Sequence, residues 1–250
     1  MAYKTLSSEV YNIDKKIGKS FGDIEFYQQL LNGVKGMVLE PGTGNGRVLF
    51  SLYDAGFNIE GFDLSSTMLN YAKNYAKEHR KNVNLFHANM VDFNRACQYE
   101  AIIIPTGTFC LIIDEDAVKK ALKNFYEHLK PKGYLILDLL VPTSLTLDAV
   151  PTRSFQTDAG EVIEVSVKNI SKNETTKVFH SVNHYVKKYK GQTIAEEEEK
   201  FDLKWHDIMT FKQWLRTIGF DKITIYSDYD LHKPIDRSKL IYTIKAQKSH

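Results

Sequence analysis

The stretch that decides the fold is Glu40-Pro41-Gly42-Thr43-Gly44-Asn45-Gly46-Arg47, which lies between two apolar runs. Met37-Val38-Leu39 precedes it and Val48-Leu49-Phe50-Ser51-Leu52 follows it, so the pattern predicts a strand, a glycine-rich turn and the start of a helix. Alternate glycines remove side chains where a backbone turns sharply and approaches a ligand closely. The helix that follows presents unpaired amide groups and a positive dipole end to that ligand. We therefore expect a ligand site at this turn.

Two residues of this stretch distinguish between candidate ligands. A dinucleotide fingerprint requires G-x-G-x-x-G, but the position three after Gly44 is Arg47, whose bulk hinders the close helix–strand packing that a third glycine permits. Glu40 would repel a phosphate at the mouth of the turn and attract an ammonium group. The pattern acidic-x-G-x-G-x-G therefore disfavours a nicotinamide-dependent oxidoreductase.

In these residues the chain resembles the class I S-adenosylmethionine-dependent methyltransferases, in particular the small-molecule group with methyltransferase domain 25. A second motif supports the resemblance, because Asp63, Ser65, Met68 and Leu69 match the family pattern acid-x-S-x-x-M-L after a predicted second strand. Asp63 lies 21 residues beyond Gly42, about where a ribose-binding acid is expected. Met68 would offer a polarizable surface near the adenine. The alternative is that Asp63 caps a turn and Met68 fills the core.

The resemblance implies a wider site for S-adenosyl-L-methionine. Glu40, assisted by a carbonyl around Pro105 or Thr106, would bind the ammonium group. Arg47 would either pair with the carboxylate of the cofactor or extend from its helix into solvent. The complete set of expected cofactor-binding residues is Tyr11, Glu40, Gly42, Thr43, Gly44, Arg47, Asp63, Leu64, Met68, Asn89, Met90 and Thr106.

Three further positions of that set leave alternatives open. Asn89 stands where the family often carries an acid that accepts the adenine amino group, and an Asn carbonyl can accept the same N–H. Asp92 is the competing position, and the backbone N–H of Met90 would serve another adenine nitrogen. Tyr11 would close over the methionine part of the cofactor, or it packs, with Tyr27, as a half-buried aromatic.

The end of the predicted fourth strand bears on the methyl acceptor. It reads Ile104-Pro105-Thr106-Gly107-Thr108-Phe109 and lacks the [D/N]-P-P-[Y/F/W] pattern typical of methyltransferases that act on nucleic-acid bases or glutamine amides. We therefore expect a small-molecule acceptor with an N or O nucleophile and in-line methyl transfer. His87, His180, His184 and His206 are candidate bases, but no catalytic residue is assigned. A regulatory protein that binds the cofactor without turning it over is the alternative.

Strand and helix signals alternate as far as about Val141, which predicts a parallel sheet with helices on both faces. From Arg153 to about Trp205 the period changes to two, which predicts an inserted antiparallel β meander. The resemblance implies a Rossmann-like α/β fold with a seven-stranded, mostly parallel sheet ordered 3-2-1-4-5-7-6. We expect a cofactor-binding domain of residues 1–142 and 206–250. An insert of residues 143–205 would act as a lid, with Trp205 and Thr108 near the acceptor, or as a dimer surface.

Opposite charges flank the last predicted turn of the insert. Lys187, Lys188 and Lys190 precede it, and Glu196 to Glu199 follow it. Such residues would pair across a hairpin, although a solvated edge that resists aggregation is the favoured interpretation.

Composition sets the remaining expectations. The chain of 250 residues is 43% hydrophobic and 26% charged, as in ordinary globular proteins, and its formal charge of +2 gives no footprint for nucleic acid. Cys97 and Cys110 fit neither a metal-ligand spacing nor a disulfide framework, so no metal is expected. The start lacks a signal peptide, and no apolar run approaches 18 residues. We expect a cytoplasmic enzyme without a membrane partner, as a monomer or homodimer.

Overall fold

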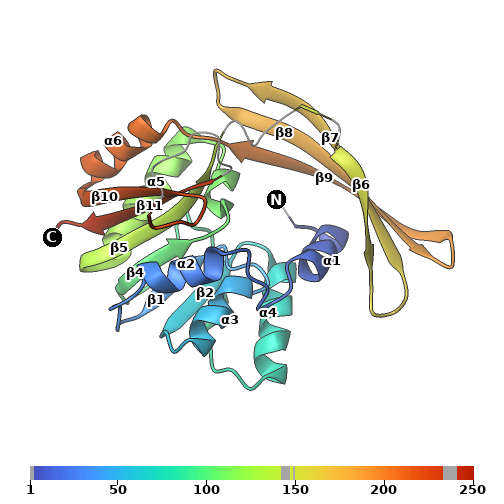
Figure 1. The fold of residues 1–250 in the computed structure, drawn as a ribbon, viewed down its shortest axis with the longest axis horizontal. Coiled ribbons are helices and arrows are strands. Elements are labelled where there is room, and N and C mark those ends of the chain that lie inside the picture. The colour runs from blue at the N-terminus through green and yellow to red at the C-terminus, as the bar shows by residue number, and fades with distance from the viewer. Residues whose placement is uncertain (1–2, 142–146, 149, 233–240) are drawn as a thin grey trace.

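Two separate sheets organise the molecule (Figure 1). The structure is a computed structural model, and it describes residues 3–141, 147–148, 150–232 and 241–250. In these residues the larger sheet has 7 strands and the smaller has 4. None of the helices in the described part of the chain is long and apolar enough to cross a membrane.

The larger sheet has the order β3-β2-β1-β4-β5-β11-β10. Counted within this sheet alone, that order is 3-2-1-4-5-7-6, so the predicted fold class is confirmed. Neighbouring strands from β3 to β5 are parallel, whereas β11 runs antiparallel to both β5 and β10. The strands are β1 Val38–Pro41, β2 Ile59–Asp63, β3 Leu85–His87, β4 Tyr99–Ile104, β5 Leu129–Leu140, β10 Phe220–Ser227 and β11 Ile241–Lys248.

Helices cover both faces of this sheet, which explains the continuous apolar run at residues 101–104. Ile102 and Ile104 belong to the same core cluster as α5 and α6, whereas Ala101 and Ile103 belong to the cluster of α2, α3 and α4. A strand buried on both faces cannot alternate apolar and polar residues. The helices are α1 Thr5–Asp14, α2 Asp23–Leu30, α3 Arg47–Asp54, α4 Ser66–Glu78, the 3-10 helix η1 Thr108–Leu111, α5 Glu115–His128 and α6 Ile208–Ile218.

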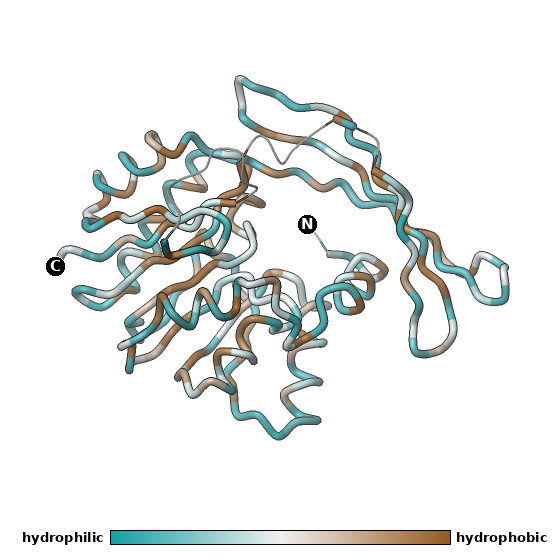
Figure 2. Tube along the Cα trace, in the orientation of Figure 1, coloured by the Kyte–Doolittle hydropathy of each residue, from teal (hydrophilic) through white to brown (hydrophobic). Residues whose placement is uncertain are grey.

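The smaller sheet, which we call the second sheet, is an antiparallel meander between β5 and α6 with the order β6-β7-β8-β9. Its turns are largely hydrophilic, whereas hydrophobic residues concentrate in the larger sheet (Figure 2). The proposed domain boundary at residues 142 and 143 lies outside the described residues, so the domain division stays a prediction. The strands are β6 Val150–Gln156, β7 Val162–Asn173, β8 Val178–Tyr189 and β9 Gln192–Lys204.

Lys187 and Lys188 do not pair with Glu196 to Glu199 across the last turn of the second sheet. Lys187 instead bonds Glu9 and Glu161, and Lys188 bonds Glu164. Glu199 is only 2% exposed, so the solvated-edge interpretation is wrong for this residue. The physical reason is that α1 packs against β9 and covers this part of the strand.

Candidate cofactor and acceptor site

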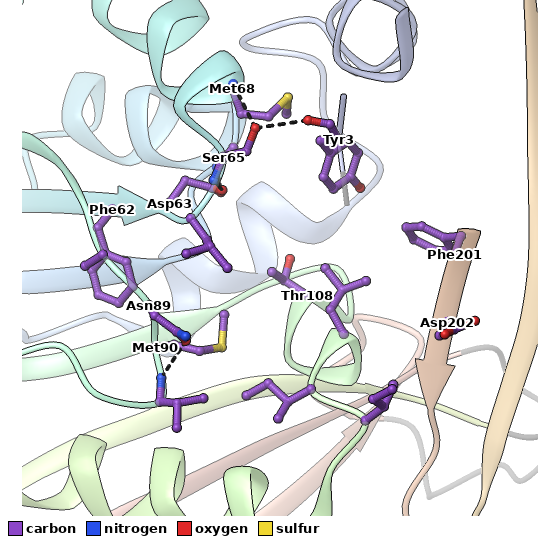
Figure 3. A pocket seen from close by; sticks show the side chains of 18 of the residues that line it. Tyr3, Phe62, Asp63, Ser65, Met68, Asn89, Met90, Thr108, Phe201 and Asp202 are labelled. Carbon is purple, nitrogen blue, oxygen red and sulfur yellow. Dashed lines mark hydrogen bonds between the residues drawn. The ribbon is translucent and has the colours of Figure 1, made fainter. Parts of the chain in front are cut away.

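A cavity of about 400 Å³ lies where the parallel strands end, between them and β9 (Figure 3). Its walls come from the segments that follow β1, β2, β3 and β4, from the N-terminal segment and from the second sheet. Ligands of open α/β sheets bind at this end of the strands. The lining residues are Tyr3, Tyr11, Gly42, Gly44, Phe62, Asp63, Leu64, Ser65, Met68, Ala88, Asn89, Met90, Val91, Thr108, Leu111, Ile112, Ile113, Lys200, Phe201 and Asp202.

The glycine turn after β1 requires residues without a side chain. Gly42 has φ +71°, and a Cβ there would lie 2.5 Å from the methyl carbon of Thr108. Gly44 has φ +60°, and its Cβ would lie 3.1 Å from the terminal methyl carbon of Met68. The backbone therefore approaches the cavity closely, as the glycine spacing predicts.

Asp63 ties this turn to the start of α4. One carboxylate oxygen accepts the Gly44 N–H and the other accepts the Ser65 N–H, both at 2.8 Å. Burial raises the pKa of Asp63, and these backbone donors oppose that rise. Ser65 caps α4, because its hydroxyl accepts the Met68 N–H at 3.3 Å. Asp63 thus presents a fixed carboxylate to the cavity and also organises the turn.

Glu40 lies behind the turn rather than in the cavity wall. It is only 3% exposed, and Thr43 donates its hydroxyl to the carboxylate at 3.1 Å. Burial raises the pKa of Glu40 to about 8. No ion pair to Glu40 occurs among the described residues. A buried carboxylate without a paired cation suits an ammonium group, because a nearby positive charge would stabilise its ionised form.

Arg47 adopts neither of the two predicted orientations. It is 3% exposed and its guanidinium binds the carboxylate of Asp23, while one of its nitrogens donates to the Lys19 carbonyl at 2.8 Å. Asp23 begins α2 and Arg47 follows the glycine turn, so this buried ion pair holds the start of α2 against the turn. Arg47 does not line the cavity, so direct pairing with a cofactor carboxylate is corrected to a structural contact.

The segment after β3 places Asn89 and Met90 in the wall, as expected, together with Leu64 from the segment after β2. The Asn89 side-chain carbonyl accepts the Val91 N–H at 3.0 Å, which fixes its direction. Asp92, the competing position, does not line the cavity. Of the two candidate positions, Asn89 and not Asp92 therefore faces the cavity.

Thr106 follows β4 and lies outside the lining set, as do Glu40 and Thr43. Its φ is +58°, and its N–H donates to Asp138 at 2.6 Å. Asp138 is fully buried and also accepts hydroxyls from Tyr27, Tyr229 and Thr243. This network fixes the turn after β4. The half-buried packing role considered for Tyr27 is thus replaced by a buried hydrogen bond.

Comparisons with known proteins agree with this geometry. Residues 38–133, which contain the glycine turn and Asp63, match the family model described as a methyltransferase domain. A crystal structure of an S-adenosylmethionine-dependent methyltransferase from Clostridium acetobutylicum ATCC 824 superposes with a TM-score of 0.79 at 17% identity, covering 97% of this chain and 98% of that one. Residues 38–133 therefore form a methyltransferase domain, and the whole chain has the fold of S-adenosylmethionine-dependent methyltransferases.

Two relatives extend the comparison beyond the fold. A Geobacillus sp. (strain WCH70) protein, provisionally named a methyltransferase, is 24% identical over 207 residues, which are 83% of each chain. The glycine/sarcosine N-methyltransferase of Halorhodospira halochloris is 35% identical over 125 residues, which are 48% of this chain and 45% of that protein. These matches confirm the predicted enzyme class, and the neighbours solved as S-adenosylmethionine-dependent enzymes agree with the predicted cofactor.

The opposite wall of the methyltransferase cavity contains residues that the sequence argument missed. Tyr3 packs edge-on against Tyr11 with ring centroids 5.2 Å apart and against Phe201 at 6.4 Å. Lys200 and Asp202 flank Phe201 on β9 and also line the cavity. No local motif marks these residues, because only tertiary packing brings Tyr3 and β9 together.

Of the two residues predicted to lie near the methyl acceptor, only one lines the cavity. Thr108 lines the cavity, whereas Trp205 is buried against Phe179 and borders a separate cavity of about 90 Å³. Trp205 follows β9 directly, and its ring packs against Phe179 of β8 and under the Lys172 ammonium of β7.

None of the four candidate histidines lines the methyltransferase cavity. His87 bonds the Leu64 carbonyl at 2.9 Å, and His180 bonds Asp202 at 2.9 Å. His184 lies 3.7 Å from Glu196. Burial lowers the pKa of His206 to about 4 and keeps it neutral. The contacts of His87, His180 and His184 favour structural roles, and His206 packs among the rings of Phe211 and Trp214.

Proposed function

We propose that this methyltransferase transfers the methyl group to an amine nitrogen of a small molecule. The observation that carries the proposal is the composition of the cavity wall. Among the described residues that line it there is no histidine, and its carboxylates are Asp63 and Asp202. Asp63 accepts two backbone amides and Asp202 is bonded to His180, so both carboxylates already have hydrogen-bond partners within the chain.

The absence of such a base among these residues favours nitrogen over oxygen as the acceptor atom. A hydroxyl needs a positioned base to remove its proton during attack, whereas an unprotonated amine already carries a free electron pair. Burial also raises the pKa values of Tyr3 and Tyr11, so neither phenol is a base near neutral pH. The name of the Halorhodospira relative, a glycine/sarcosine N-methyltransferase, supports the same acceptor class.

The residues around the glycine turn would hold the cofactor. Glu40, next to Thr43, would bind the ammonium group, Asp63 would accept ribose hydroxyls, and Asn89 with Met90 would face the adenine. When bound, S-adenosylmethionine supplies an electrophilic methyl group on its sulfonium. The chain itself aligns the acceptor and excludes water, and such alignment lowers a barrier by about 7–11 kcal/mol in favourable cases.

The second sheet would act as a lid over the acceptor half of the cavity. Its support is that Lys200, Phe201 and Asp202 line the cavity, together with the apolar Leu111, Ile112 and Ile113 after β4. The chain would thus divide into a cofactor-binding domain of residues 1–142 and 206–250 and an insert of residues 143–205. Light scattering distinguishes the monomer, expected for a lid, from a homodimer.

The compartment would be a reducing cytoplasm, which the free thiols of Cys97 and Cys110 support.

Turnover of methyl-labelled cofactor tests the proposal. The acceptors are glycine, sarcosine and an amino sugar, each paired with its hydroxyl analogue, and nucleic acid is the macromolecular comparison. We expect label on at least one amine and none on the paired hydroxyl compound. Label on the hydroxyl compounds alone contradicts the proposed acceptor class. Binding of S-adenosylhomocysteine without transfer to any acceptor favours the regulatory alternative.

A further inference from the structure

Helix α1 carries no N-terminal cap of its own. Its N-cap residue is Lys4, whose side chain makes no capping hydrogen bond, and its first turn contains no acidic residue. The first amides of any α-helix lack partners within the helix. An exposed helix with such a start is only weakly stabilised, so these amides need acceptors from elsewhere.

The second sheet supplies the acceptors. The Leu6 and Ser7 N–H groups each donate to a different carboxylate oxygen of Glu197 on β9, both at 3.0 Å. Next to Glu197 on β9, Glu199 accepts the Tyr3 N–H, and the Glu198 carbonyl accepts the Lys4 ammonium at 2.8 Å. The Glu197 carboxylate also lies at the positive end of the helix dipole. Glu197 therefore caps a helix about 190 residues away in sequence.

Apolar and ionic contacts between α1 and the second sheet continue along the helix. Leu6 and Val10 belong to one buried cluster with Ile163, Val165 and Tyr185 of the second sheet. Farther along, Lys187 binds Glu9 at 3.0 Å. One side of α1 is thus fixed to the second sheet from its first turn onward.

The other side of α1 reaches the glycine turn. Asn45 donates its amide to the Asn12 side chain at 3.0 Å and to the Lys15 carbonyl at 2.9 Å. Just before the helix, the Tyr3 carbonyl accepts the Ser65 hydroxyl at 3.2 Å. Tyr3 and Tyr11 from this segment line the cavity, and Figure 3 shows Tyr3 between Ser65 and Phe201.

We propose that Glu197 is a positioning residue for the cofactor half of the site. By capping α1 it fixes Tyr3 and Tyr11 over the glycine turn and Asp63, although Glu197 itself does not line the cavity. The second sheet then controls cofactor affinity as well as acceptor binding. This inference rests on the proposed function, since it requires that S-adenosylmethionine occupies the half of the cavity beside the glycine turn.

The test compares three variants of the full chain: Glu197→Ala, Glu197→Gln and the control Glu198→Ala. Each removes one negative charge from the same stretch of β9, but Glu198 contributes only its backbone carbonyl to α1. The affinity for S-adenosylhomocysteine is measured by calorimetry. Hydrogen exchange of residues 5–14 reports on α1, and the melting temperature reports on the whole fold.

We expect Glu197→Ala to lower the affinity by about twofold to thirtyfold, the range that losing one cap produces when its free energy is expressed as a ratio. Exchange in α1 should rise in the same variant. Glu197→Gln keeps one accepting oxygen and should give an intermediate loss, whereas Glu198→Ala should bind as the wild type does.

Three results overturn the inference: unchanged affinity in Glu197→Ala, an equal loss in Glu198→Ala, or a lower melting temperature with unchanged affinity. The last is the signature of a merely structural cap. If Glu197→Ala fails to fold, the Glu197→Gln result decides by the same criteria. Failure of the wild type to bind S-adenosylhomocysteine would instead contradict the proposed function, so the two failures are distinguishable.

Discussion

The two walls of the cavity are built in different ways. The wall beside the glycine turn comes from short segments that each follow a parallel strand, and its groups are fixed by local hydrogen bonds such as those of Asp63. The opposite wall combines Tyr3 with Phe201, which are distant in sequence and meet only through α1 and the second sheet. The first wall suits a cofactor shared by a family. The second suits an acceptor particular to one enzyme, with Tyr3 at the boundary between the two halves.

The largest effect is expected in the first wall, for Asp63→Ala. We expect the affinity for S-adenosylhomocysteine to fall by about 30-fold to 100-fold, because a charged acceptor for ribose hydroxyls and for the Gly44 N–H is lost. Calorimetry measures the affinity, and thermal melting verifies the fold. The control is Asp92→Ala, since Asp92 lies outside the cavity wall and should bind normally. Equal losses in the two variants would erase the distinction between Asp63 and its neighbours.

A somewhat smaller effect is expected for Glu40→Gln, and it depends on pH. Burial raises the pKa of Glu40 to about 8, so in the free protein the carboxyl is largely protonated at pH 6 to 7 and ionised above pH 8. A bound ammonium group favours the ionised form, so wild-type affinity should rise with pH up to about 8 and then level off. Glu40→Gln should bind about tenfold more weakly at pH 8.5, and its affinity should lose this dependence.

The free energy of unfolding of the free protein should change with pH in the direction opposite to cofactor affinity. A carboxyl whose folded pKa lies above its unfolded value destabilises the fold once it ionises, so stability falls as pH rises from about 4.5 toward 8. Removing this charge should raise the melting temperature of the free protein at pH 8.5 by about 2–4 °C, as a gain near 1 kcal/mol gives for a chain of this size. A lower melting temperature in Glu40→Gln would mean that this carboxylate stabilises the free fold.

For the second wall we expect a separation of effects in Phe201→Ala. The ring lines the cavity beside Tyr3, so its loss should raise KM for the methyl acceptor about fivefold through lost apolar contact. Affinity for S-adenosylhomocysteine should change less than about threefold, because Asp63 is untouched and Glu197 and Glu199 still hold the Tyr3 segment in place. Steady-state kinetics and calorimetry provide the two values. A larger effect on cofactor affinity than on KM would show that the walls are not separate in function.

The smallest effect is expected for His180→Asn. His180 bonds Asp202 on the second sheet and does not line the cavity, so kcat/KM should change by less than about twofold at any pH between 6 and 9. A loss of kcat/KM well beyond twofold, together with loss of the pH dependence that the wild type shows, would identify His180 as a base.

The sequence predicted the first wall because its features are local. A glycine spacing, an acid at the end of a strand and a capping serine each specify backbone geometry within a few residues, and the structure places Gly42, Gly44, Asp63 and Met68 around the cavity accordingly. The sheet order followed from family resemblance, while the continuous apolar run at residues 101–104 marked a strand buried on both faces.

Other features depended on distant contacts and escaped prediction. The partner of Arg47 is Asp23, 24 positions earlier, and no spacing rule connects the two. The glutamates of β9 resembled a solvated edge, since nothing local indicates that Glu197 and Glu199 meet the N-terminal segment. Tyr3 lacked any motif, and Trp205 was placed near the acceptor although its ring packs away from the cavity.

The most direct test of the central claim is a calorimetric titration of the wild-type protein with S-adenosylhomocysteine and, separately, with NAD. Because Glu40 precedes three alternate glycines and Asp63 ends β2, we expect the protein to bind S-adenosylhomocysteine with a stoichiometry of one. We expect no binding of NAD. Tight binding of NAD without binding of S-adenosylhomocysteine would contradict the account.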